Sequence, residues 1–161
     1  MNILPQLSDS CKIWVYFAEQ SLGEKEAIVS REVESFLAQW KAHGTPLVAG
    51  CEIVDNQMLV IAVDEASQQA TGCSIDSQVR FMQQLGEQLD INFFNRQLLA
   101  AQVGSGLKVY SFQDFDKALK EGTVSEHTKV FDHLLPNLGA IRSKGLNPLA
   151  NSWHKNLLSH A

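Results

Sequence analysis

The chain has 161 residues, of which 45% are hydrophobic and 19% are charged. These values are typical of a globular protein with a packed core, and we expect one domain spanning residues 1–161. No stretch approaches the roughly 20 apolar residues of a membrane span, and the opening residues lack the pattern of a secretory signal. The net charge is −5 and the basic residues form no stripe, so no nucleic-acid partner is expected.

The three cysteines, Cys11, Cys51 and Cys73, are odd in number and far apart. This spacing favours reduced thiols over a disulfide framework, so we expect a cytoplasmic protein. The sequence contains no C-x-x-C, H-E-x-x-H, G-x-G-x-x-G or G-x-x-x-x-G-K-[ST] motif. We therefore expect neither a cofactor nor a metal site.

The chain begins with a predicted strand and a predicted helix. Residues 12–17 are rich in β-branched and aromatic side chains, which is typical of a buried strand. Apolar residues then recur every three or four positions from 29 to 40, which predicts an amphipathic helix. His43 lies at or just past its last turn, and Gly44 can adopt the left-handed conformation that ends it.

A hairpin and a second helix follow. Residues 47–54 and 58–63 predict two strands, the second apolar throughout and therefore covered on both faces. Ser74 is the expected N-cap of a helix over residues 75–89. Residues 91–94 then predict a short strand.

The resulting order, β-α-β-β-α-β, is the split β-α-β plan of ferredoxin-like folds. Residues 98–103 and 107–111 add an extra hairpin, residues 112–119 a short helix, and the remainder reads as an irregular C-terminal tail. The sequence therefore predicts an α+β fold with a ferredoxin-like core.

Cys73 has the sequence setting that best suits chemistry. It directly precedes Ser74, where unpaired N–H groups and the helix dipole favour an anion and a more readily ionised thiol. The same geometry suits a bound phosphate or carboxylate, with Gly72 allowing close approach of the backbone. The alternative is an ordinary turn and cap, with Cys73 packed as a small hydrophobe. On chemistry alone, that alternative is favoured.

Charged side chains flank this block. Asp64 and Glu65 follow the apolar strand and, with Asp76, form a candidate group for cation binding or acid–base work. The alternative is a strand leaving the core for solvent and a solvated helix start. Arg96 offers a planar fork either to an anion or to an ion pair with Asp64 or Asp76.

His43 and His154 are the candidate bases for a Cys–His pair with Cys73. Each also has a structural alternative, since His43 can stabilise a helix end and Trp153-His154 can anchor the C-terminal tail. His127 and His133 are six residues apart and do not share a helical face, so a two-histidine metal site is not expected.

Five short segments carry a family resemblance, and Gly72-Cys73-Ser74-Ile75-Asp76 is the most specific of them. The chain resembles, over nearly its whole length, a family of bacterial proteins often labelled "ABC transporter ATPase". That family has no established activity, so the resemblance implies no residue roles. Because the phosphate loop of such ATPases is missing, we expect no ATPase activity. The other four segments are Trp14-Val15-Tyr16, Trp40-Lys41-Ala42-His43-Gly44, Val63-Asp64-Glu65 and Ser152-Trp153-His154.

Three functional hypotheses follow. The leading one is a cytosolic accessory or binding protein that holds a small anionic ligand at the helix entrance. The second is an enzyme with Cys73 as nucleophile and His43 or His154 as base. The third is a structural protein that forms a homodimer through a sheet edge. The candidate ligand-binding residues are Asp64, Glu65, Gly72, Ser74, Asp76 and Arg96.

Overall fold

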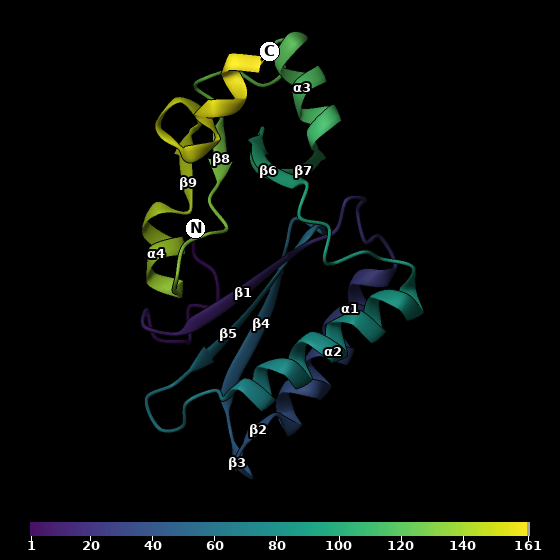
Figure 1. Ribbon diagram of the computed structural model, residues 1–161, viewed down its shortest axis with the longest axis vertical. Coiled ribbons are helices and arrows are strands. Elements are labelled where there is room, and N and C mark those ends of the chain that lie inside the picture. The colour runs from purple at the N-terminus through teal and green to yellow at the C-terminus, as the bar shows by residue number, and fades with distance from the viewer. Residues whose placement is uncertain (161) are drawn as a thin grey trace.

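The computed structural model describes the backbone of residues 1–160 and the side chains of residues 1–158. Two antiparallel sheets lie one above the other in Figure 1, with a pair of long helices on the lower sheet and shorter helices around the upper one. This mixture of helices and antiparallel sheets confirms the α+β class. In the described part of the chain, no helix has both the length and the apolarity to cross a membrane.

The lower sheet contains β1 (Lys12–Phe17), β4 (Val48–Val54) and β5 (Met58–Asp64) in the order β1-β5-β4. The helices α1 (Lys25–Gln39) and α2 (Gly72–Leu89) pack side by side on one of its faces. The apolar residues of β5 are at most 1% exposed, because one core lies toward the helices and another toward the upper sheet. The prediction of a strand covered on both faces is confirmed.

The upper sheet has the order β7-β6-β8-β9 and is built from the second half of the chain. Its outer face packs on α3 and on the C-terminal segment, and its inner face shares a core with the lower sheet. The predicted extra hairpin and short helix are confirmed as β6, β7 and α3, whereas the tail expected to be irregular supplies two further strands. The elements are β6 (Leu98–Val103), β7 (Gly106–Ser111), α3 (Phe112–Lys120), β8 (Lys129–Phe131), α4 (Leu138–Lys144), β9 (Leu146–Pro148), η1 (Leu149–Asn151) and η2 (Trp153–His160).

The predicted strand over residues 91–94 is wrong, and the ferredoxin-like plan lacks its fourth strand. Asn92 and Asn95 accept hydrogen bonds from the backbone N–H groups two residues later, at 3.1 and 3.0 Å. Such local side-chain bonds replace the ladder that a strand would need. As a result, β1 remains the edge strand of the lower sheet.

The predicted end of the first helix is also wrong. α1 ends at Gln39, and the chain then forms a small hairpin of β2 (Lys41–Ala42) and β3 (Thr45–Pro46). Trp40 causes this change of direction, because its side chain is 2% exposed and its Nε1 donates to the Ser74 carbonyl at 2.8 Å. A tertiary contact therefore overrides the helical pattern.

Two side chains of the β4–β5 turn connect the sheets. Asp55 accepts a hydrogen bond from the Leu107 N–H at 2.7 Å, and Gln57 accepts one from the Val109 N–H at 3.2 Å. Both donors belong to β7, the edge strand of the upper sheet. These bonds cover part of an edge that would otherwise be open to another chain.

Arg142 of α4 holds the N-terminal segment in place. Its guanidinium donates to the carbonyls of Ile3, Leu4 and Leu7 and to the carboxylate of Asp9. Arg142 therefore connects residues at the two ends of the chain, and Ile3 and Leu4 stay buried beneath the sheet.

Candidate functional site

The entrance to α2 is closed by its own capping bonds. Thr71, and not Ser74, is the N-cap: its hydroxyl accepts from the Ser74 N–H at 3.3 Å, and the Ser74 hydroxyl accepts from the Thr71 N–H at 2.7 Å. The Ser74 carbonyl accepts bonds from Trp40 and Ser77. Ser74 is therefore buried with its oxygens engaged inside the fold.

Gly72, Cys73 and Asp76 lie on the exposed side of the same turn. A Cβ added at Gly72 would meet no atom of the described residues within 4 Å. The three grooves described below include none of these residues. The helix entrance is an open, capped surface.

Asp64 and Glu65 shape the loop that leads to α2. Asp64 accepts a hydrogen bond from the Ala66 N–H at 2.9 Å, and Glu65 accepts one from the Ala70 N–H, also at 2.9 Å. Among the described residues, no three His, Cys, Asp or Glu side chains are grouped to hold a metal ion. These carboxylates act on the loop backbone.

The two candidate bases lie apart. His43 is exposed in the turn between β2 and β3, with φ at 50°. His154 is fully buried in η2, at the top of Figure 1, with its Nδ1 2.7 Å from the Ser152 hydroxyl. Burial lowers the pKa of His154 to about 4, and the charge of His133 acts in the same direction. Within the described chain, neither ring hydrogen-bonds to Cys73, and no Cys–His pair is assembled.

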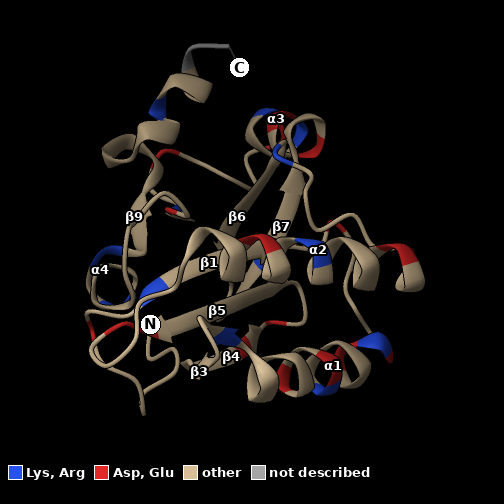
Figure 2. Ribbon diagram, turned by 60° about the horizontal axis from the view of Figure 1, so that its bottom comes forward, with Lys and Arg blue, Asp and Glu red and all other residues tan. Residues whose placement is uncertain are grey.

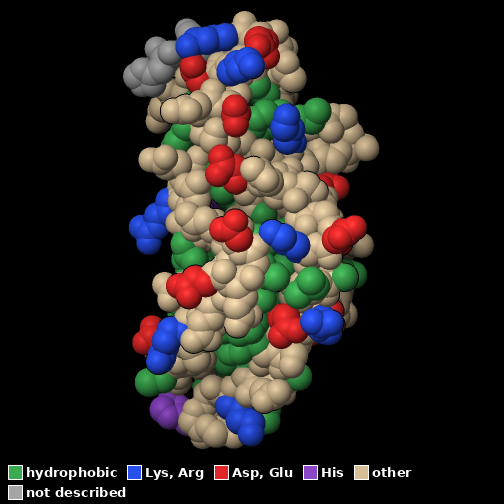
Figure 3. Space-filling view, turned by 90° about the vertical axis from the view of Figure 1, so that its right-hand side faces the viewer, with side chains coloured by type: hydrophobic (Ala, Val, Ile, Leu, Met, Phe, Trp, Pro, Cys, Tyr) green, Lys and Arg blue, Asp and Glu red, His purple; other side chains and the backbone are tan. Residues whose placement is uncertain are grey.

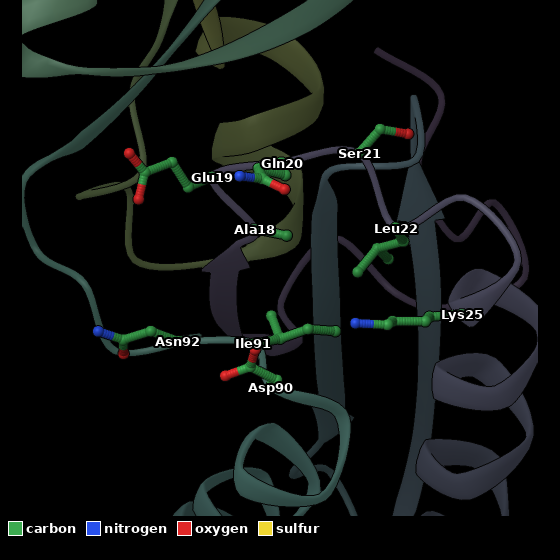
Figure 4. A pocket seen from close by; sticks show the side chains of 9 residues that line it. All are labelled: Ala18, Glu19, Gln20, Ser21, Leu22, Lys25, Asp90, Ile91 and Asn92. Atoms are coloured by element: carbon green, nitrogen blue, oxygen red, sulfur yellow. The ribbon is translucent and has the colours of Figure 1, made fainter.

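Two grooves flank the long helices. Hydrophobic side chains gather between charged ones over α1 and α2, in the lower half of Figure 3, where a groove of about 490 Å³ holds the stacked rings of Phe36 and Phe81. A second cleft, of about 260 Å³, lies between the β1–α1 loop and the turn after α2 (Figure 4). Lys25 lines this cleft, and its ammonium group already donates to the Leu89 carbonyl at 2.7 Å. Lys41 lines the first groove together with Glu32, and its ammonium group has no partner among the described residues.

A third groove, of about 390 Å³, lies beside the outer edge of β1, where the missing fourth strand would run. We call it the edge cleft. It is bounded by the edge strand, the turn after α2, the start of β6 and the segment after β8. Its lining residues are Val15, Tyr16, Phe17, Phe93, Phe94, Asn95, Arg96, Leu98, His133 and Leu134.

Aromatic rings form the walls of the edge cleft. The Tyr16 ring contacts Phe93 and Phe94 edge to face, with centroids 6.4 and 5.5 Å apart. Phe17 contacts the His133 ring in the same way at 5.7 Å. Phe94 is 39% exposed, which places a large apolar surface in contact with water at the rim.

The lining side chains that carry nitrogen are Asn95, Arg96 and His133. Arg96 is exposed, and in the described part of the chain its guanidinium contacts no carboxylate or carbonyl, including those of Asp64 and Asp76. The Nδ1 of His133 is buried without a partner. Burial lowers the pKa of His133, while the nearby Asp132 carboxylate opposes that shift. The cleft therefore combines a free cation with an imidazole whose pKa is lowered by burial.

Of the residues selected from the sequence, only Arg96 lines the edge cleft. Tyr16 and His133 were missed as site residues, because strand periodicity assigns Tyr16 to a core and His133 follows no recognisable motif. The adjacent aromatic residues Phe93 and Phe94 were a sequence signal for the cleft, since the structure buries the Phe93 ring and exposes the Phe94 ring. Figure 2 shows acidic and basic residues interspersed along α1 and α3.

Comparisons with protein families, curated proteins and solved structures returned no match to this chain. The functional assignment therefore depends on the geometry and chemistry of the edge cleft.

Proposed function

We propose that this chain is a cytoplasmic binding protein that holds a carboxylate-bearing ligand with an apolar body in the edge cleft. The observation that carries the proposal is the unengaged guanidinium of Arg96 beside walls made of aromatic rings. Small-molecule sites typically are clefts of about 300–1,000 Å³ with apolar walls and a few polar groups. The edge cleft, at about 390 Å³, falls in that range.

Each part of such a ligand has a matching surface. A carboxylate can accept two parallel hydrogen bonds from the Arg96 guanidinium, the geometry that arginine favours. An apolar body would contact Tyr16 and Phe94 and remove the exposed surface of the Phe94 ring from water.

A binding role fits the molecule better than thiol catalysis at Cys73. His43 and His154 belong to separate elements, and His154 is fully buried against Ser152. A nucleophile needs a base within hydrogen-bond reach, which Cys73 lacks among the described residues. The anionic ligand expected from the sequence is kept in this proposal, with its binding site moved from the helix entrance to Arg96.

The test uses 4-phenylbutyrate as the probe and its uncharged alcohol, 4-phenylbutanol, as the matched ligand. Binding is followed by amide chemical shifts of the ¹⁵N-labelled protein. We expect Arg96→Gln to weaken 4-phenylbutyrate binding by about tenfold or more, since a charged hydrogen bond is lost, and to leave 4-phenylbutanol unaffected. Arg80→Gln, which removes an exposed arginine of α2, is the control.

The helix entrance is tested in the same titration. Cys73→Ser should leave the affinity for 4-phenylbutyrate unchanged. Shifts centred on Cys73 and Asp76, or equal affinity in wild type and Arg96→Gln, would overturn the assignment of the edge cleft.

A further inference from the structure

We propose that the ligand of the edge cleft is the carboxyl-terminal end of a polypeptide, bound as a fourth strand alongside β1. The inference rests on the proposed function and specifies its ligand class. It is carried by the backbone of β1, which is independent of the side chains that line the cleft.

The hydrogen-bonding direction of β1 follows from one bond at its end. The Ala18 N–H donates to the Gln57 carbonyl at 2.8 Å, in the register that pairs β1 with β5. In an antiparallel ladder, alternate residues point their N–H and C=O groups to the same side. Even-numbered positions therefore bond to β5, and Val15 and Phe17 present their backbone groups to the opposite, open side.

The start of this open side confirms the alternation. The carbonyl of Cys11, an odd-numbered position, accepts from the Leu138 N–H at 3.0 Å, and Lys12 forms an isolated bridge with Asn137. This contact closes the edge near the beginning of β1. Further along, Val15 and Phe17 have no outward backbone partner among the described residues, and both line the edge cleft.

Unpaired edge groups bind an extended chain by strand addition, which supplies main-chain hydrogen bonds along the edge. Side chains of an added strand point alternately to its two faces. Apolar residues line the cleft on both, since Phe94 packs against Tyr16 of the helix-side core and Leu98 belongs with Phe17 to the core between the sheets. A short extended peptide with apolar residues fits this arrangement.

Two features identify the occupant as a chain terminus: the short length of the open edge and the positive charge of Arg96 beside it. Only the stretch from Val15 to Phe17 is open, which is shorter than the edge that two copies of a sheet would need for a stable interface of about 1,000 Å² or more. Among the described residues that line the cleft, Arg96 alone carries a permanent charge, so it lacks a negative partner there. A terminal carboxylate supplies that charge.

The test probe is the peptide acetyl-Val-Thr-Val-Leu with a free carboxylate, added to the ¹⁵N-labelled full chain. Saturating peptide should slow amide hydrogen exchange at Val15 and Phe17 by about tenfold or more, because both become hydrogen-bonded. Trp14 and Tyr16 should exchange at unchanged rates, since their amides already bond to β5. These neighbouring amides form an internal control.

Modified peptides separate charge from strand pairing. Replacing the carboxylate by an amide should weaken binding by about tenfold or more, through loss of the contact with Arg96. N-methylation of the two central peptide nitrogens, one at a time, should give one weakened peptide and one of nearly unchanged affinity, since only alternate N–H groups face β1. Equal effects of the two methyl groups would overturn strand addition.

A backbone variant gives a second line of evidence. Val15→Pro removes an outward N–H and leaves the β5 side of the strand intact. It should abolish binding of the peptide. If this variant does not fold, the N-methylated peptides alone decide the question.

The remaining outcomes are also distinguishable. Binding of 4-phenylbutyrate without peptide-dependent protection at Val15 and Phe17 overturns the peptide inference and leaves the proposed function standing. Failure of both probes overturns both. In the absence of peptide, protection is compared with the mass in solution at several protein concentrations. If protection rises with concentration and the mass doubles, a second copy occupies the edge and the peptide assignment is overturned.

Discussion

Replacing Arg142 by Met tests how much the contacts between α4 and the N-terminal segment stabilise the fold. Arg142 donates to the carbonyls of Ile3, Leu4 and Leu7, and its side chain is 19% exposed. Its partner Asp9 is 74% exposed, so that ion pair contributes little. The expected loss of stability therefore comes from the three carbonyl contacts.

The magnitude follows from the chemistry of those contacts. Hydrogen bonds from a charged donor contribute roughly 1.5–3 kcal/mol each, and water will reach part of the released carbonyl surface. We expect Arg142→Met to lower the free energy of unfolding by about 3 kcal/mol. Lysine has no planar fork and can reach fewer of the carbonyls, so Arg142→Lys should restore about 1 kcal/mol of that loss.

Urea unfolding followed by tryptophan fluorescence measures these differences, with linear extrapolation to water. Lys144→Met is the matched control, because Lys144 is exposed on the same helix and should change stability by less than about 0.5 kcal/mol. Amide exchange at Cys11, whose N–H donates to the Ser8 carbonyl, reports local release of the N-terminal segment. If Arg142→Met and Lys144→Met lose the same small amount, the assigned role of Arg142 is refuted.

Three further predictions concern reactive and titratable groups. Iodoacetamide at pH 8 should label exposed Cys73 at least about tenfold faster than Cys11 or Cys51. The reason is that burial raises the pKa of Cys11, and burial together with the Glu34 charge raises the pKa of Cys51 to about 11. Equal labelling of the three cysteines, measured by mass spectrometry, would contradict this prediction. Below pH 6.5 the unfolded His154 takes up a proton that the folded ring, with its pKa of about 4, does not. Stability should therefore fall by about 3 kcal/mol between pH 7 and pH 4, and His154→Gln should reduce that fall while His127→Gln should not, as urea unfolding at each pH would show. Pure protein should release no phosphate from MgATP; saturable release abolished by Asp64→Ala would refute that expectation.

Local patterns in the sequence predicted most of the elements, and tertiary contacts decided the rest. The run from Met58 to Val63 identifies its own strand, because a short, uninterrupted apolar segment is typical of a strand covered on both faces. Trp40 looks like one more apolar position of a helix, yet its Nε1 bond to Ser74 turns the chain aside. No local pattern contains that information.

The same distinction applies to the candidate site. Arg96 could be selected from its chemistry, because an arginine after two aromatic residues suits an anion. The cleft around it could not, since it exists only because residues 91–94 fail to pair with β1. His154 was selected as a reactive base, and its burial against Ser152 follows from packing that its neighbours in the sequence do not specify.

The hydrogen bonds that Asp55 and Gln57 accept from β7 also affect the order of folding during synthesis. Each bond joins residues 52 positions apart, so the acceptors leave the ribosome well before their donors. At about 5–20 residues per second, that interval is about 3–10 s. During this interval, the lower sheet can assemble with α1 and α2. The face of β5 that the upper sheet later covers stays open. Nascent chains arrested before and after Leu107 should therefore differ in how readily they are captured by chaperones.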